Sequence, residues 1–176
     1  MRSVVLIMSV VAGGFSNFIS ASGSAMPSPL HVRPGALSTP LRLNTIANGG
    51  QAQDEFSLLS VVDSVGTGGS TERLVLNYGD RFGKVWKGEP GFFQVALEKT
   101  GRRIVIDLSQ VTRTGIEPSQ LRAALAKSKF VATTDMTMDP QDHTTNLTLN
   151  LRSAVDVHLS TLKGSKSQVI LDLKGR

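Results

Sequence analysis

Polar side chains that could bind a saccharide or a peptide alternate with apolar ones along four segments of this 176-residue chain. A period of two places the polar side chains of an extended segment on one face of a sheet. A guanidinium group can hold a carboxylate through two parallel hydrogen bonds, and amides can exchange hydrogen bonds with sugar hydroxyls and peptide groups. The candidate binding residues of these segments are Arg73, Asn77, Arg103, Asp107, Asn146, Asn150, Gln168 and Asp172.

The same side chains have a second interpretation, which the sequence leaves open. A sheet face exposed to water can carry an arginine and an aspartate that pair with each other and only keep the face soluble. Under this interpretation the polar residues have no ligand.

The four segments form two similar pairs, which indicates an internal duplication. Residues 71–78 (TERLVLNY) match residues 144–151 (TTNLTLNL), and residues 102–109 (RRIVIDLS) match residues 167–174 (SQVILDLK). The offsets, 73 and 65 residues, differ because the first copy has the longer connection. If the two strands of each copy pair, the duplication predicts two related sheets that cover each other's apolar faces.

Strand-forming segments dominate the folded part of the chain. They are residues 56–63, 72–78, 82–87, 92–99, 102–109, 129–138, 145–151, 155–161 and 167–173. Pro118, followed by apolar residues at helical spacing, predicts one helix over residues 119–127 that connects the two halves. The expected fold class is all-β: a sandwich of two related small antiparallel sheets from an internal duplication, with one short connecting helix.

The N-terminus has the layout of a secretory signal peptide over residues 1–25. A positive start precedes the apolar run 4–19, and small residues lead to a cleavage position after Ala25. An uncleaved membrane anchor is the alternative, although the run is short for a bilayer span. We therefore expect an exported, periplasmic protein without stable membrane insertion after cleavage.

Residues 26–55 are rich in proline, glycine and serine and have no sustained apolar periodicity. Such a composition predicts a disordered linker, because it cannot bury enough apolar surface to offset the entropy of ordering. The folded domain is then expected over residues 56–176.

Composition limits the classes of function. A formal charge of +5 and a pI of about 9.9 favour an anionic partner such as cell wall, nucleic acid or a membrane surface. The basic residues at 99–103 lack the interleaved aromatic side chains of a nucleic-acid groove, so no nucleic-acid partner is expected. The absence of cysteine rules out disulfides and thiol chemistry.

No motif predicts catalysis, a metal or a cofactor. The three histidines, His31, His143 and His158, belong to no triad or zinc motif in this sequence. Asp139 and Asp142 precede His143 closely, but this spacing is typical of an ordinary turn. We expect a protein that is not an enzyme.

The order of these segments resembles an AMIN domain, the module at the N-terminus of periplasmic N-acetylmuramoyl-alanine amidases and of type IV pilus secretins. The resemblance rests on TERLVL at 71–76, RRIVIDL at 102–108, NLTLNL at 146–151 and QVILDL at 168–173, and it covers residues 56–174. It implies a β-sandwich that binds peptidoglycan through its outward sheet faces and localises itself or a partner, such as a secretin or an amidase.

Carried over by position, Arg73, Arg103 and Asp107 match the exposed motif positions of that family. The second copy departs from the pattern, because Asn146 stands where the family has another arginine and Gln168 replaces a charged or bulky residue. This departure favours an alternative: a protein-interaction accessory of a pilus, a secretin or another envelope machine, with little affinity for the wall.

Overall fold

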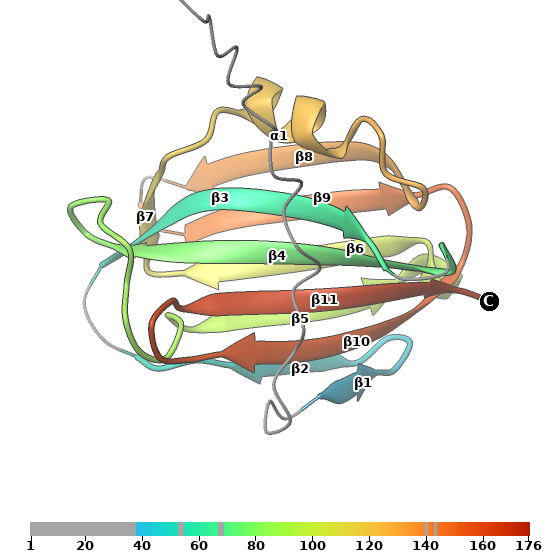
Figure 1. Cartoon of the computed structure of the whole chain (residues 1–176), viewed down its shortest axis with the longest axis horizontal. Coiled ribbons are helices and arrows are strands. Elements are labelled where there is room, and N and C mark those ends of the chain that lie inside the picture. Colours follow the sequence, from blue (N-terminus) through green and yellow to red (C-terminus); the bar gives the residue numbers. More distant parts are fainter. Residues whose placement is uncertain (1–37, 53–54, 67–68, 140, 143) are drawn as a thin grey trace, which may run out of the picture.

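Two β-sheets packed face to face form the part of the chain that the computed structural model describes, residues 38–176 without 53–54, 67–68, 140 and 143 (Figure 1). From edge to edge, sheet A contains β1 (Thr39–Leu41), β10 (Val155–Leu162), β11 (Gln168–Gly175), β4 (Thr71–Asp80), β3 (Phe56–Val65) and β7 (Val111–Thr114). Sheet B contains β2 (Ile46–Gly49), β5 (Phe93–Glu98), β6 (Arg103–Ser109), β9 (Thr144–Leu151) and β8 (Val131–Asp139). The expected two-sheet, mostly β fold with one short helix is confirmed.

The apolar side chains of the alternating pattern fill the space between the sheets. Leu76 of β4 and Ile106 of β6 are each 1% exposed, and their neighbours two residues away are buried as well. At one end of this core Tyr78 and Trp86 both meet the Phe56 ring edge to face, with ring centroids 6.1 and 5.6 Å apart. Edge-to-face packing of this kind stabilises aromatic pairs beyond their buried area.

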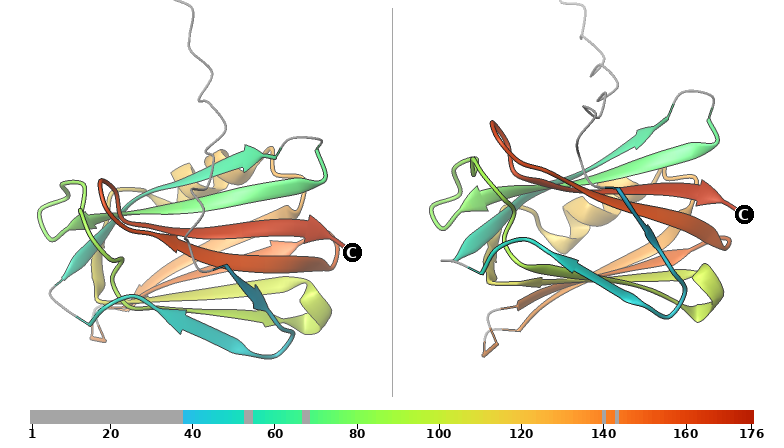
Figure 2. Two further views of the ribbon diagram at one scale, coloured as in Figure 1. Left: turned by 60° about the horizontal axis from the view of Figure 1, so that its bottom comes forward. Right: turned by 90° about the horizontal axis from the view of Figure 1, so that it is seen from below.

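Two different elements close the two open sides of the sandwich (Figure 2). The helix α1 (Pro118–Leu125) packs beside β3 and β8 and buries Leu121 and Leu125. A capping box between Glu117 and Gln120 begins it, with Pro118 in the first turn. On the other side, β1 pairs with β10 and β2 pairs with β5, so a single segment borders both sheets.

The strands of one copy do not pair with each other, contrary to the sequence interpretation. β4 pairs with β11 in sheet A, and β6 pairs with β9 in sheet B. The local hairpins β3–β4 and β5–β6 lie in different sheets because the long connection 81–92 carries the chain from one layer to the other. Each sheet therefore combines one hairpin from each half of the chain.

The two sheets share register as well as strand order. Leu171 lies opposite Leu74 in sheet A, and Ile106 lies opposite Leu147 in sheet B. The β3–β4 ladder shifts between residues 58 and 60, and the β8–β9 ladder shifts 73 residues later, between 131 and 133.

Three local expectations differ from the structure. Sheet A is mixed rather than antiparallel, because β7 runs parallel to β3. Residues 39–49, inside the segment interpreted as a linker, contain β1 and β2; edge positions of this kind tolerate Pro40, which has no N–H to donate. Residues 82–87 form no strand, and only Val85 bridges to Gly79.

Candidate functional site

The outer face of sheet A brings four of the predicted binding residues together, and they pair with one another. Arg73 Nε and Nη2 donate to the two carboxylate oxygens of Asp172 at 2.5 and 2.8 Å. Beside this pair, Gln168 Nε2 donates to Asn77 Oδ1 at 2.6 Å, and Asn77 Nδ2 donates to Ser60 Oγ at 2.9 Å. Most of the hydrogen-bonding capacity predicted for this face is therefore used within the protein.

The centre of the same face is apolar and buried. Val75 is 1% exposed and Ile170, which lies directly opposite, is 4% exposed. The pairing of Arg73 with Asp172 thus agrees with the interpretation in which an arginine and an aspartate serve the sheet itself. It differs in one respect from the expected arrangement, because the two residues come from different halves of the chain.

The outer face of sheet B brings the other four predicted residues together and leaves them less engaged. Arg103 lies opposite Asn150, and Asp107 lies opposite Asn146, all on the half-buried middle strands β6 and β9. Asn150 Nδ2 donates to Thr133 Oγ1 at 3.1 Å. The structure shows no side-chain hydrogen bond of Asn146 among the described residues.

Arg103 forms a long ion pair with Glu98 and has one N–H group without an acceptor in the described structure. Its Nη1 lies 3.5 Å from Glu98 Oε2, and the two side chains are 33% and 42% exposed. Its buried Nε has no acceptor in the described part of the chain. A buried N–H without an acceptor is costly, so an incoming carboxylate or carbonyl at this point would satisfy it.

Strand β8 extends this face with residues that the sequence interpretation missed. Thr133, Asp135 and Thr137 are exposed and lie beside Asn150, Thr148 and Asn146 respectively. The register shift at residues 131–133 reverses the alternation of inward and outward side chains at the start of β8. A simple period of two therefore assigns these residues to the wrong face. The alternation that resumes after residue 133 was the signal that could have identified them.

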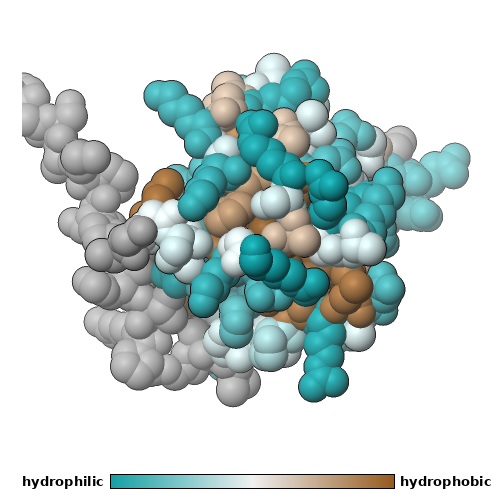
Figure 3. Space-filling model, turned by 90° about the vertical axis from the view of Figure 1, so that its right-hand side faces the viewer, coloured by the Kyte–Doolittle hydropathy of each residue, from teal (hydrophilic) through white to brown (hydrophobic). Residues whose placement is uncertain are grey.

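One end of the sandwich carries a cluster of cations, which we call the basic end: Lys99, Arg102, Lys129, Arg152 and Arg176. Arg102 Nη2 donates to the carbonyl oxygen of Arg152 at 2.8 Å, and Arg176 pairs with Asp156 through Nε–Oδ1 at 2.7 Å. Figure 3 faces this end of the molecule, where hydrophilic side chains surround an apolar centre. The fold thus gathers cations from the β5–β6 hairpin, the β9–β10 turn, the α1–β8 link and the C-terminus.

A pair of carboxyl groups lies near the same link, on the inner side of sheet A. Glu72 is fully buried and accepts hydrogen bonds from Ser128 Oγ and from the backbone N–H of Lys129, the second at 2.7 Å. Burial, followed by the charge of Glu72 and a hydrogen bond with it, raises the pKa of Asp63 from 3.8 to about 6. This arrangement joins β4 to the chain after α1 and offers no open site.

Among the described residues, the remaining candidates Asp139, Asp142 and His158 give no catalytic or metal geometry. Asp139 Oδ1 accepts the backbone N–H groups of Gln141 and Asp142 at 2.8 and 3.3 Å, which is ordinary turn chemistry, and His143 lies outside the described residues. His158 is exposed on β10, and His31 also lies outside the described part. No group of three or more His, Asp or Glu side chains that could hold a metal occurs among the described residues.

The predicted signal peptide lies outside the described part of the chain. Within that part, no helix has the length and apolar character needed to cross a bilayer. Neither the known family models nor the curated proteins include a match to this sequence.

Proposed function

We propose that this chain is a non-catalytic module of the cell envelope that binds peptidoglycan through the outer face of sheet B. The observation that carries the proposal is the difference between the two outer faces. On sheet A, Arg73 and Asp172 pair with each other, as do Asn77 and Gln168. On sheet A the buried atom of these four residues without a partner in the described chain is Gln168 Oε1. On sheet B, Asn146 has no side-chain hydrogen bond and the buried Nε of Arg103 has no acceptor within the same described residues, so more of the predicted capacity is unused.

The chemistry of this face suits peptidoglycan. The polymer presents sugar hydroxyls, acetamido groups, peptide amides and carboxylates. Amide side chains such as Asn146 can donate and accept simultaneously, which suits hydroxyl and amide partners. Arg103 supplies the charge-assisted hydrogen bonds that a carboxylate prefers.

The basic end supports the same proposal. Arg103 lies at the start of β6, one residue after Arg102 of the basic end, so the polar face and the cations adjoin. A concentration of positive charge raises the local concentration of an anionic polymer and speeds its encounter with the protein. The formal charge of +5 is consistent with an anionic partner.

The proposal extends to origin and location. An internal duplication explains why the two sheets share strand order, register and the position of the β3 and β8 shifts. The resemblance of the same segments to an AMIN domain supports a periplasmic module that localises itself or a partner such as a secretin or an amidase. The signal-peptide layout of residues 1–25 supports export.

Co-sedimentation of the purified protein with isolated peptidoglycan sacculi tests the proposal. Saturable pelleting that Arg103→Gln weakens would support binding through sheet B. Arg113→Gln is the matched control, because Arg113 is an exposed arginine on β7, an edge strand of sheet A, and not on the outer face of sheet B. No pelleting of the wild-type protein would contradict wall binding and favour the protein-interaction accessory, which cross-linking in the envelope would then identify.

A further inference from the structure

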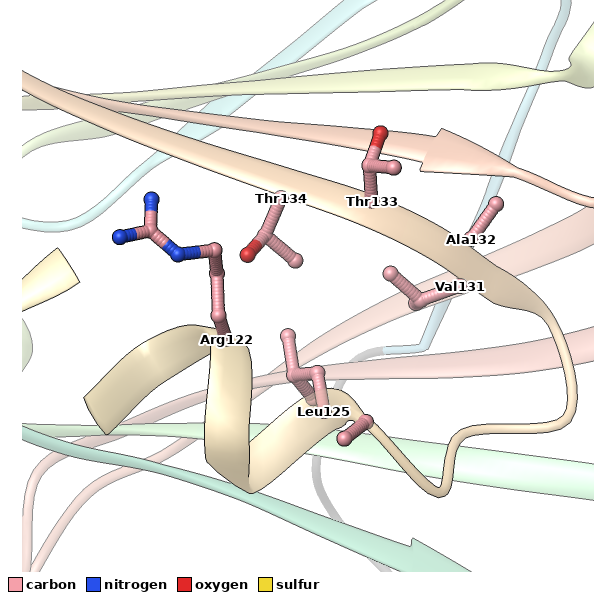
Figure 4. Close-up of a pocket in the computed structure, with 7 residues that line it drawn as sticks. Arg122, Leu125, Val131, Ala132, Thr133 and Thr134 are labelled. Carbon is pink, nitrogen blue, oxygen red and sulfur yellow. The ribbon is translucent and has the colours of Figure 1, made fainter. Parts of the chain in front are cut away.

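A groove lies between α1 and β8 at the edge of sheet B, next to the polar face to which Thr133 belongs (Figure 4). Its volume is about 300 Å³, at the lower end of the range for small-ligand pockets. The residues that line it are Arg122, Leu125, Ala126, Val131, Ala132, Thr133 and Thr134. Leu125 and Val131 are buried and give it an apolar floor.

One wall of the groove is the open edge of a sheet. Within the described residues, β8 is the last strand of sheet B and pairs only with β9. In an antiparallel strand, alternate residues direct their N–H and C=O groups away from the paired neighbour. Such an edge can pair with an added extended segment, and the side chains of that segment then enter adjacent pockets.

Two polar side chains in the groove lack partners that would occupy them. Thr134 is 9% exposed, and its Oγ1 has no hydrogen-bond partner within the described chain. Arg122 is exposed and forms none of the ion pairs found in the described residues. Figure 4 shows the Thr134 hydroxyl directed into the pocket, on the side where Arg122 rises from α1.

We propose that this groove binds a short extended peptide that bears a carboxylate. The peptide backbone pairs with the edge of β8, and its carboxylate accepts hydrogen bonds from Arg122 and Thr134. A guanidinium group favours a carboxylate because its two parallel N–H donors match the two oxygens. The small volume and the alanine at position 132 select a peptide with small side chains.

Titration with acetyl-tetra-alanine, monitored by the backbone amide signals of the protein in NMR spectra, tests this site. We expect saturable shifts at Ala132, Thr133 and Thr134. The same peptide with a C-terminal amide should bind about fivefold more weakly, because it loses the charge-assisted hydrogen bonds. A third peptide has D-alanine at its last two positions. Tighter binding of this peptide would indicate a wall stem peptide as the natural ligand, and tighter binding of the all-L peptide would indicate a protein C-terminus.

Two variants and one control separate the site from the general charge of the protein. Arg122→Gln should remove the preference for the carboxylate over the amide, and Thr134→Val should weaken both peptides without lowering the melting temperature. Arg113→Gln changes the charge equally and should preserve binding, since Arg113 of β7 does not line the groove. Equal binding of the acid and amide peptides to the wild type would overturn the assignment of Arg122.

Absence of shifts at residues 132–134 with peptide at about 10 mM, well above a weak Kd of 1 mM, would overturn the whole site. The test is independent of wall binding through the outer face of sheet B. If the ligand is a protein terminus, Arg122→Gln should leave co-sedimentation with sacculi unchanged; if it is a wall stem peptide, Arg122→Gln should reduce pelleting in part. In either case Arg103→Gln should leave the peptide shifts unchanged. A failure of one proposal therefore does not imply a failure of the other.

Discussion

Arg73 and Asp172 form a two-point ion pair between β4 and β11, with Nε–Oδ1 at 2.5 Å and Nη2–Oδ2 at 2.8 Å. At the corresponding position of sheet B, Asp107 lies opposite Asn146, and its carboxylate accepts only the Ser109 hydroxyl, at 3.2 Å, in the described structure. The aspartate on sheet A is paired because Arg73 lies opposite it, whereas the aspartate on sheet B faces the uncharged Asn146. This difference underlies the first two predictions.

Asn146→Arg should reproduce on sheet B the pair that sheet A already has. The new guanidinium would lie opposite Asp107 and stabilise the protein by up to about 1 kcal/mol, the upper range for a partly exposed pair. Although the AMIN pattern has an arginine at this position, the new pair with Asp107 would use the polar groups of the face, so we expect weaker co-sedimentation with sacculi. Urea unfolding measures the stability, and Asn146→Gln, which adds no charge, is the control; stronger pelleting would contradict a role for an open face.

Arg73→Ala should lower the free energy of unfolding by roughly 1 kcal/mol, because it breaks a bidentate pair whose members are only 20% and 30% exposed. Asp172→Ala should cost a similar amount, and the double variant should cost less than the sum. A double-mutant cycle by urea unfolding measures this coupling. Binding to sacculi should not change. A loss of pelleting in Arg73→Ala would indicate that sheet A takes part in binding.

Ile106→Asp should unfold the protein. Ile106 is 1% exposed between Val95 and Leu147, so the substitution would bury an unpaired charge at a cost of about 3–5 kcal/mol. The matched control is Val105→Asp, one residue away on the outer face, which should remain folded. Circular dichroism and thermal melting distinguish them, and a cooperative melt of Ile106→Asp would mean that the faces of β6 are reversed.

The raised pKa of Asp63 makes stability depend on pH. An unfolded aspartate ionises near 3.8, whereas in the folded protein Asp63 holds its proton up to about pH 6. The folded state therefore binds more protons between these values, and its stability contribution falls as the pH rises from about 4 to 6, then levels. Asp63→Asn should remove this decline and increase stability at neutral pH.

Urea unfolding at several pH values measures the effect of Asp63→Asn. Asp135→Asn is the control, because Asp135 is an exposed carboxylate on β8. If both variants retained the wild-type slope between about pH 4 and 6, the pKa of Asp63 would not be raised in solution.

Local patterns in the sequence predict most strands of this fold but not their partners. Leu74, Leu76 and Tyr78 alternate with polar residues, and the core side of β4 follows directly from that period. The pairing of β4 with β11 does not follow, because it depends on the crossing of the chain between the layers at 81–92. For the same reason each outer face combines predicted site residues from both halves of the chain, rather than the four residues of one copy.

The short edge strands and the bulges could not be predicted from the sequence, for a different reason. β1 and β2 have three and four residues and are recognisable only through the strands they border. Ala132 at the β8 shift moves the following side chains by one position, so Thr133, Asp135 and Thr137 face outward against the expected parity. Three or four residues carry no reliable period, whereas a ten-residue strand such as β4 does.

The central place of β11 in sheet A sets the order in which the molecule can be completed during synthesis. β11 lies between β10 and β4, and Asp172 pairs with Arg73, 99 residues earlier in the chain. At a synthesis rate of about 5–20 residues per second, the two residues are made roughly 5–20 s apart. Throughout that interval the apolar edge of β4 lacks its partner, so a nascent chain exposes it to chaperones or to a neighbouring copy. Removal of the last eight residues should therefore prevent folding of the entire sheet rather than fray one end.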